Sequence, residues 1–112
     1  MRAETLKGHL DGLLLASLEA GPRHGYAIME ALRAGSGGQF DLPTGTIYPA
    51  LRRLEQAGLI KGTWSRAGGR QRRVYDLTPA GRRTLAAERG TWREFSAAVT
   101  ALLQPAPRPV TP

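Results

Sequence analysis

Cysteine is absent from this chain of 112 residues, histidine occurs twice, and aromatic residues make up only 6% of the sequence. Without cysteine the protein cannot form a disulfide, a thiolate zinc site or a cysteine nucleophile. The two histidines, His9 and His24, are too few for a metal site, and we interpret His24 as a structural residue near the start of a helix. The sequence therefore predicts neither a metal nor another cofactor.

Acidic residues are also scarce: 16 lysines and arginines stand against 9 aspartates and glutamates, which gives a net charge of +7. The segment 52–73 contains seven basic residues and one acidic residue, a net charge of +6. Because arginine donates two hydrogen bonds to a phosphate at once, this segment predicts a polyanion such as DNA as partner. An anionic membrane surface is the competing interpretation. It is disfavoured because the basic residues do not form an amphipathic helix with an apolar face.

Long apolar runs and enzyme motifs are missing as well. The leucine cluster at 13–15 is far too short to span a bilayer, and the N-terminus lacks a signal-peptide pattern, so we expect a cytoplasmic protein. No glycine-rich phosphate loop ends in lysine, and no pair of carboxylates is placed for a pocket, so we do not expect an enzyme. The length suits one small domain that gains stability by pairing with a second copy.

Apolar residues at spacings of three and four predict three short helices in the first half of the chain. The first covers residues 5–20 and ends at a glycine-proline pair, whose Pro22 opens the second helix. The second helix ends in the glycine-rich segment 35–38. Tyr26 lies on its predicted apolar face, so we expect Tyr26 to belong to the core.

The third helix begins near residues 44–46 and leads into an arginine-rich β-hairpin. Pro49 is tolerated only near the first turn, which favours Thr46 as the N-cap, and Gly58 suits the position after the last helical residue. We predict the two strands of the hairpin at residues 59–65 and 70–77, joined by a glycine-rich turn at residues 66–69.

The last helix begins at Thr78-Pro79, a residue pair typical of an N-cap and first helical position, and runs to about Leu103. Its apolar residues form a stripe close to a heptad seam: Leu85, Trp92, Phe95, Val99, Leu102 and Leu103. No segment of the chain remains to cover the stripe, which predicts a homodimer. The segment 104–112 contains four prolines and is expected to be extended and mobile.

These elements predict a mainly α fold with a two-stranded β-wing. We divide it into a winged helix-turn-helix domain (1–78), a dimerisation helix (79–103) and a proline-rich tail (104–112). In such a fold the third helix enters a DNA groove and the basic hairpin follows the backbone.

A series of short motifs falls between residues 24 and 81, and Trp92 continues it. The motifs are His24-Gly25-Tyr26, Gly45-Thr-Ile-Tyr-Pro49 with Leu51 and Leu54, Gly58-Leu-Ile60, Trp64, Gly-Arg-x-Arg at 69–72, Tyr75, and Leu77-Thr78-Pro79-x-Gly81. Together they resemble the PadR family of bacterial transcription regulators, and the single C-terminal helix resembles its short subfamily. The resemblance implies a homodimer that binds a palindromic operator, usually as a repressor, with the last helix and helix 1 at the dimer interface.

The candidate DNA contacts lie on the third helix and the hairpin. They are Thr44, Thr46, Tyr48, Arg52, Arg53, Arg66, Arg70 and Arg72. Hydroxyl groups suit phosphate, and arginine either reads guanine or neutralises phosphate. The alternative is a solvated charged surface with Tyr48 packed on the wing. Arg73 shares a strand face with Tyr75, so we expect it to be partly structural.

Two overlapping sets of residues are candidates for the dimer. The interface set is Leu6, Leu10, Leu85, Trp92, Val99, Leu102 and Leu103, and the set at the dimer centre is Trp92, Ser96, Leu13 and Phe95. The resemblance implies that two Trp92 indoles hold a planar aromatic effector between them by stacking. The alternative is that Trp92 only anchors the dimer.

The sequence therefore predicts a DNA-binding transcriptional regulator, acting as a ligand-responsive repressor. Two alternatives remain open: a winged-helix module that binds another protein, and an architectural DNA-binding protein without an inducer.

Overall fold

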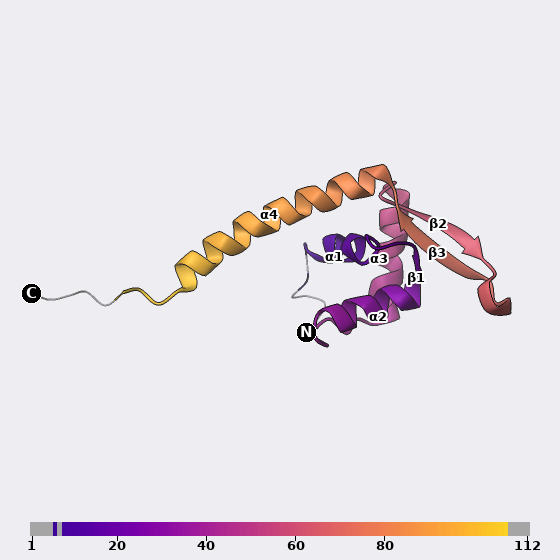
Figure 1. Ribbon diagram of the computed structural model, residues 1–112, viewed down its shortest axis with the longest axis horizontal. Helices are drawn as coiled ribbons and strands as arrows, with labels where there is room; N and C mark the ends of the chain where they lie inside the picture. Colours follow the sequence, from indigo (N-terminus) through magenta and orange to yellow (C-terminus); the bar gives the residue numbers. More distant parts are fainter. Residues whose placement is uncertain (1–5, 7, 108–112) are drawn as a thin grey trace, which may run out of the picture.

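The computed structural model describes residues 6 and 8–107. Its elements are α1 (Leu10–Ser17), β1 (Arg23–His24), α2 (Gly25–Gly35), α3 (Thr44–Gln56), β2 (Ile60–Ser65), the short 3₁₀ turn η2 (Ala67–Gly69), β3 (Arg72–Leu77) and α4 (Pro79–Leu103). Helices α1 to α3 form a cluster, the β2–β3 hairpin projects from one side, and α4 extends away on the other (Figure 1). This arrangement confirms the predicted mainly α winged helix with a long C-terminal helix.

The core lies between the three short helices and the base of the hairpin. Its fully buried large side chains are Leu14, Leu15, Leu18, Ile28, Ile47, Leu51, Leu54 and Ile60. Most of them recur at helical spacing, so each helix buries one face. Each such side chain contributes about 1.5–3 kcal/mol relative to an exposed position.

Helix α1 is shorter than the predicted segment 5–20. Gly8 has a φ of +87°, a left-handed conformation that cannot continue into a right-handed helix, and α1 therefore begins only at Leu10. Its C-cap is Leu18. Residues 5 and 7 of the predicted segment lie outside the described residues, as do residues 1–4.

The prediction that Pro22 opens the second helix was wrong. Instead, a two-residue strand, β1, follows it and pairs antiparallel with β3, with His24 opposite Val74. The sheet therefore has three strands in the order β1-β3-β2 rather than the two predicted. His24 is the N-cap of α2, and its Nδ1 atom accepts a hydrogen bond from the Ala27 N–H at 3.2 Å.

Helix α3 begins two residues earlier than its predicted cap. Pro43 is the N-cap, without a side-chain hydrogen bond, and the predicted cap Thr46 is the third residue of the helix. Pro49 lies inside α3, where its missing N–H removes one backbone hydrogen bond. The end of the helix is as predicted: Gly58 has a φ of +77°, and the Leu59 N–H donates to the Leu54 carbonyl at 3.0 Å.

Helix α4 begins and ends where the sequence predicts. The Thr78 hydroxyl accepts the Gly81 N–H at 3.0 Å and donates to the Gly58 carbonyl at 2.6 Å, so one side chain caps α4 and ties it to the end of α3. Although α4 has 25 residues, no helix in the described part of the chain is long and apolar enough to cross a membrane. Gln104, which follows α4, has extended backbone angles, and residues 108–112 lie outside the described residues.

Candidate nucleic-acid interface

The wing presents its arginines around a glycine turn. Strands β2 and β3 pair from Ile60 opposite Leu77 to Ser65 opposite Arg72. At the tip, two consecutive glycines have positive φ values, +69° for Gly68 and +77° for Gly69. Residues that carry a side chain rarely adopt this backbone conformation. The turn leaves three candidate DNA contacts exposed on and beside it: Arg66, Arg70 and Arg72.

Arg73 connects the wing to α3. Its guanidinium forms an ion pair with Glu55 of α3 and lies over the Trp64 ring, 5.4 Å from the ring centre. The hydrogen bond to Glu55 raises the pKa of the Arg73 guanidinium above its usual value. A Cβ atom at Gly62 would lie 2.7 Å from the Arg73 Nε atom, so a side chain there would displace the arginine. These contacts support the structural role expected for Arg73.

The two candidate arginines of α3 differ in their surroundings. Arg53 forms an ion pair with Asp11 of α1. Arg52 is exposed and lines a shallow cleft of about 500 Å³ between α3 and β3, next to Tyr48 and Tyr75. Tyr75 lines this cleft and is also part of the core. Burial raises the pKa of its phenol above the usual value.

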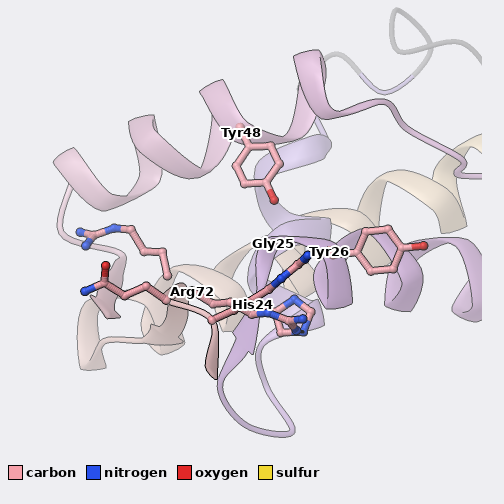
Figure 2. A pocket seen from close by; sticks show the side chains of 8 residues that line it. His24, Gly25, Tyr26, Tyr48 and Arg72 are labelled. Atoms are coloured by element: carbon pink, nitrogen blue, oxygen red, sulfur yellow. Dashed lines mark hydrogen bonds between the residues drawn. The ribbon is translucent and has the colours of Figure 1, made fainter. Parts of the chain in front are cut away.

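A second cleft, which we call the α2–wing cleft, has a volume of about 420 Å³. Its lining residues are His24, Gly25, Tyr26, Tyr48, Arg70, Gln71, Arg72 and Arg73. Figure 2 shows the Tyr48 hydroxyl pointing from α3 toward Gly25. A Cβ atom at Gly25 would lie 2.6 Å from that hydroxyl oxygen, so glycine is what allows the tyrosine to approach α2.

The expectation that Tyr26 belongs to the core was wrong, because its side chain is 67% exposed. The buried face of α2 consists of Gly25, Ile28 and Leu32. Tyr26 is one position away from that face, which is about 100° around the helix. The sequence pattern placed Tyr26 on the buried face because the residue that occupies this face at the start of α2, Gly25, has no apolar side chain and does not stand out in the pattern.

The remaining candidates on α3 lie in its first two turns. Thr44 is exposed, Thr46 is half-buried, and Tyr48 is 40% exposed. All three side chains reach the surface on the same helix as Arg52, and Tyr48 lies beside the wing.

The stripe on α4 is largely uncovered within the chain. Trp92 is 52% exposed and Phe95 is 54% exposed, and the exposure rises to 85% at Leu102 and 78% at Leu103. Val99 and Ser96 are half-buried, and the Ser96 hydroxyl donates to the Arg93 carbonyl of its own helix at 3.3 Å.

Helix α1 lies beside the first part of α4. The imidazole of His9 meets the Trp92 indole edge to face, with 5.3 Å between ring centres, and Phe95 packs on the same indole at 5.9 Å. Leu10 and Leu13 of α1 are half-buried.

Two residues predicted for the dimer interface are instead buried in this chain's own core. Leu6 is 5% exposed and Leu85 is 4% exposed. Leu85 belongs to the first turns of α4, which pack on α1 and the sheet, so the apolar stripe changes from core to surface along the helix. The exposed part of the stripe begins at Trp92.

The segment after α1 is also tied to α4 by charge. The Arg89 guanidinium donates two hydrogen bonds to the Glu19 carboxylate, at 2.6 and 2.7 Å. These hydrogen bonds lower the pKa of the Glu19 carboxyl below its usual value.

Comparison with known proteins identifies the family. Residues 14–87 match the family described as the transcriptional regulator PadR-like family. A transcriptional regulator of Mycobacterium tuberculosis is 38% identical over 74 residues, which is 66% of this chain and 56% of that protein. A crystal structure of a PadR-like transcriptional regulator from Bacillus cereus is 30% identical, with a TM-score of 0.81 over 93% of this chain and 100% of that one.

A PadR family regulator from Clostridium difficile is 32% identical, with a TM-score of 0.76 over 86% of this chain and 99% of that one. These neighbours are transcriptional regulators, in agreement with the basic wing and the exposed side chains of α3. The chain therefore belongs to the PadR-like family of transcriptional regulators, whose members bind DNA.

Proposed function

We propose that the protein is a cytoplasmic, homodimeric repressor that binds a palindromic operator through α3 and the wing. The observation that supports this proposal is that exposed arginines of α3 and the wing lie around two clefts that share Tyr48 and Arg73. Arg52 of α3 and the wing arginines 66, 70 and 72 are exposed, while Arg73 holds the wing to α3 through Glu55. Because this ion pair joins the wing to α3, the two elements can engage base edges and backbone together.

We expect the following mode of binding. Helix α3 enters the major groove, with Thr44 and Tyr48 near the backbone and Arg52 at a base edge or phosphate. The wing tip follows the adjacent backbone. In a two-fold symmetric dimer the half-sites lie about 10 base pairs apart, or a simple multiple of that spacing. Repression is the action that the family resemblance implies.

The dimer is formed by residues 79–103 together with α1. Trp92, Phe95, Leu102 and Leu103 are exposed within one chain, and a second copy of the same stripe buries them in a symmetric interface. Family members are generally dimers, and the exposed stripe supports the same state here.

An effector at the dimer centre gives the repressor its response. A planar aromatic molecule stacks between the Trp92 indoles of the two protomers and alters the separation of the two α3 helices. An uncharged or anionic probe such as anthraquinone-2-sulfonate is expected to quench Trp92 fluorescence and to release the operator. Ligand-bound dimer that holds the operator as tightly as free dimer would contradict this mechanism.

The first experiment compares binding to DNA from the protein's own promoter region with binding to scrambled DNA across a salt series. Tight, promoter-specific binding with a steep salt slope supports the proposal. Equal, weak binding to both DNAs indicates the architectural alternative. Failure to bind either DNA at low salt indicates a protein-interaction module.

A further inference from the structure

His24 makes two contacts that cannot both be hydrogen bonds. A neutral imidazole has one N–H donor and one acceptor nitrogen. The Nδ1 atom accepts the Ala27 N–H that caps α2, at 3.2 Å, so the ring proton belongs on Nε2. The Nε2 atom lies 3.1 Å from Nη1 of Arg72, which carries only donors. Two N–H groups therefore face each other.

A change of protonation does not remove this conflict. The other neutral tautomer accepts from Arg72 at Nε2, but it turns an Nδ1–H toward the Ala27 N–H and leaves the first turn of α2 without its cap. The doubly protonated ring donates on both sides. The ring satisfies both neighbours only when a hydrogen-bond acceptor lies between Nε2–H and Arg72.

The surroundings of this pair favour an anionic acceptor. His24 and Arg72 line the α2–wing cleft together with Arg70 and Tyr48, and none of the residues that line it is an aspartate or glutamate. Arg73, which also borders the cleft, is already paired with Glu55. Tyr48 of α3 and the wing residues Arg70 and Arg72, which line this cleft, also belong to the proposed DNA-binding surface (Figure 2).

We propose that the α2–wing cleft holds one backbone phosphate of duplex DNA, and that a phosphate oxygen accepts hydrogen bonds from both His24 Nε2–H and Arg72. This inference rests on the proposed function and adds a fixed anchor to it. The phosphate replaces the contact between two donors with two hydrogen bonds, both charge-assisted because the acceptor is an anion. Because His24 also caps α2 and Arg72 belongs to the wing, this single phosphate sets the position of both elements on the DNA.

A double-mutant cycle on a promoter duplex tests the shared phosphate. His24→Asn keeps a side-chain acceptor that caps α2 but lacks the ring Nε2–H, and Arg72→Gln removes the charge. Arg72→Gln is expected to reduce the salt slope by about 1 and the affinity about tenfold. His24→Asn is expected to lower affinity several-fold with little change of slope, because no counterion is released by a neutral donor.

The two losses are expected to be non-additive. In the Arg72→Gln background, His24→Asn is expected to lower DNA affinity by a smaller factor than it does in the wild type, because the phosphate is no longer held beside the ring. Arg83→Gln, which removes the same charge from an exposed position on α4, serves as the matched control and is expected to change affinity little. Wild-type affinity for His24→Asn, or fully additive losses, would overturn the inference while leaving the proposed function intact. Failure of the wild-type protein to bind DNA would overturn the proposed function itself.

The tautomer of His24 gives a second readout. Nitrogen chemical shifts from NMR should show the Nε2–H tautomer in the free protein, and the Nε2 resonance should shift when the promoter duplex is added. An Nδ1–H tautomer in both states would mean that His24 simply holds Arg72, which overturns the inference. A shift with inorganic phosphate, but no coupling between the two residues in DNA binding, would identify a site for free phosphate instead and also overturn it.

Discussion

Both arginines of α3 are exposed, but Arg53 forms an ion pair with Asp11 of α1, whereas its sequence neighbour Arg52 lines a cleft beside the wing. Two adjacent arginines on one helix therefore present their charge to different partners. The guanidinium of Arg53 is directed toward α1 and partly compensated by a carboxylate. Arg52 remains available to DNA.

We expect Arg52→Gln to weaken binding to a promoter duplex about tenfold and to reduce the salt slope by about 1, as for loss of one phosphate or base contact. Arg53→Gln is expected to lower the affinity for this duplex by less than about threefold, because Arg53 already forms an ion pair with Asp11. Fluorescence anisotropy across a salt series measures both effects. Asp11→Asn releases Arg53 and should raise affinity at low salt. Equal losses for the two arginine variants would show that the ion pair opens on DNA.

Gly81 is predicted to be one of the least replaceable residues of the fold. A Cβ atom there would overlap with the Leu59 backbone carbonyl, which cannot move without shifting the sheet. Gly81→Ala is therefore expected to lower the free energy of unfolding by about 1–3 kcal/mol, as overpacking does elsewhere. Gly45→Ala is the matched control, because nothing lies within 4 Å of its position on α3. That variant should be as stable as the wild type or more stable by a few tenths of a kcal/mol. Urea denaturation distinguishes the two.

The order of the helices and the ends of several elements could be predicted because their signals are local. Thr78-Pro79 specifies the start of α4 through a side-chain cap and a residue without an N–H, and Gly58 specifies the end of α3 through its positive φ. Strand β1 could not be predicted in this way. Two residues are too few to show an alternating pattern, and they form a strand only because β3 lies beside them.

The candidate site was predicted unevenly for the same reason. The arginines of the wing and α3 are visible as a charge cluster in the sequence, but the α2–wing cleft joins residues 48 positions apart, such as His24 and Arg72. Their proximity depends on the pairing of β1 with β3. The ion pair between Asp11 and Arg53 is likewise set by packing of α1 on α3, which residue spacing does not encode.

The exposed stripe on α4 makes a prediction about oligomeric state. Phe95→Lys places a charge in the proposed dimer interface, where it is desolvated without a partner, and is expected to shift the protein toward monomer. Ala97→Lys adds the same charge at an exposed position about 200° around the helix from residue 95 and should leave the dimer unchanged. Analytical ultracentrifugation at micromolar concentration measures the outcome. Dimers of equal stability for both variants would place the interface elsewhere.

The hydrogen-bonded pair of Glu19 and Arg89 makes the stability of the fold depend on pH in a defined direction. Arg89 lowers the pKa of the Glu19 carboxyl from its ordinary value of 4.5, so the folded state favours the ionised form. A carboxyl group whose pKa is lower in the folded state than in the unfolded state contributes its full stabilisation at any pH above the unfolded-state pKa. That contribution is lost as the pH falls through the folded-state pKa. The difference in unfolding free energy between wild type and Glu19→Gln should therefore be constant from pH 7 down to about pH 5.5 and shrink below about pH 4.5. Because both side chains are about half exposed, 1 M salt should reduce the same difference at pH 7.

Urea titrations of the two proteins at pH 7, 5.5 and 3.5 test this pH dependence. A difference that is unchanged at pH 3.5 would show that Glu19 acts through packing against α4 rather than through its charge.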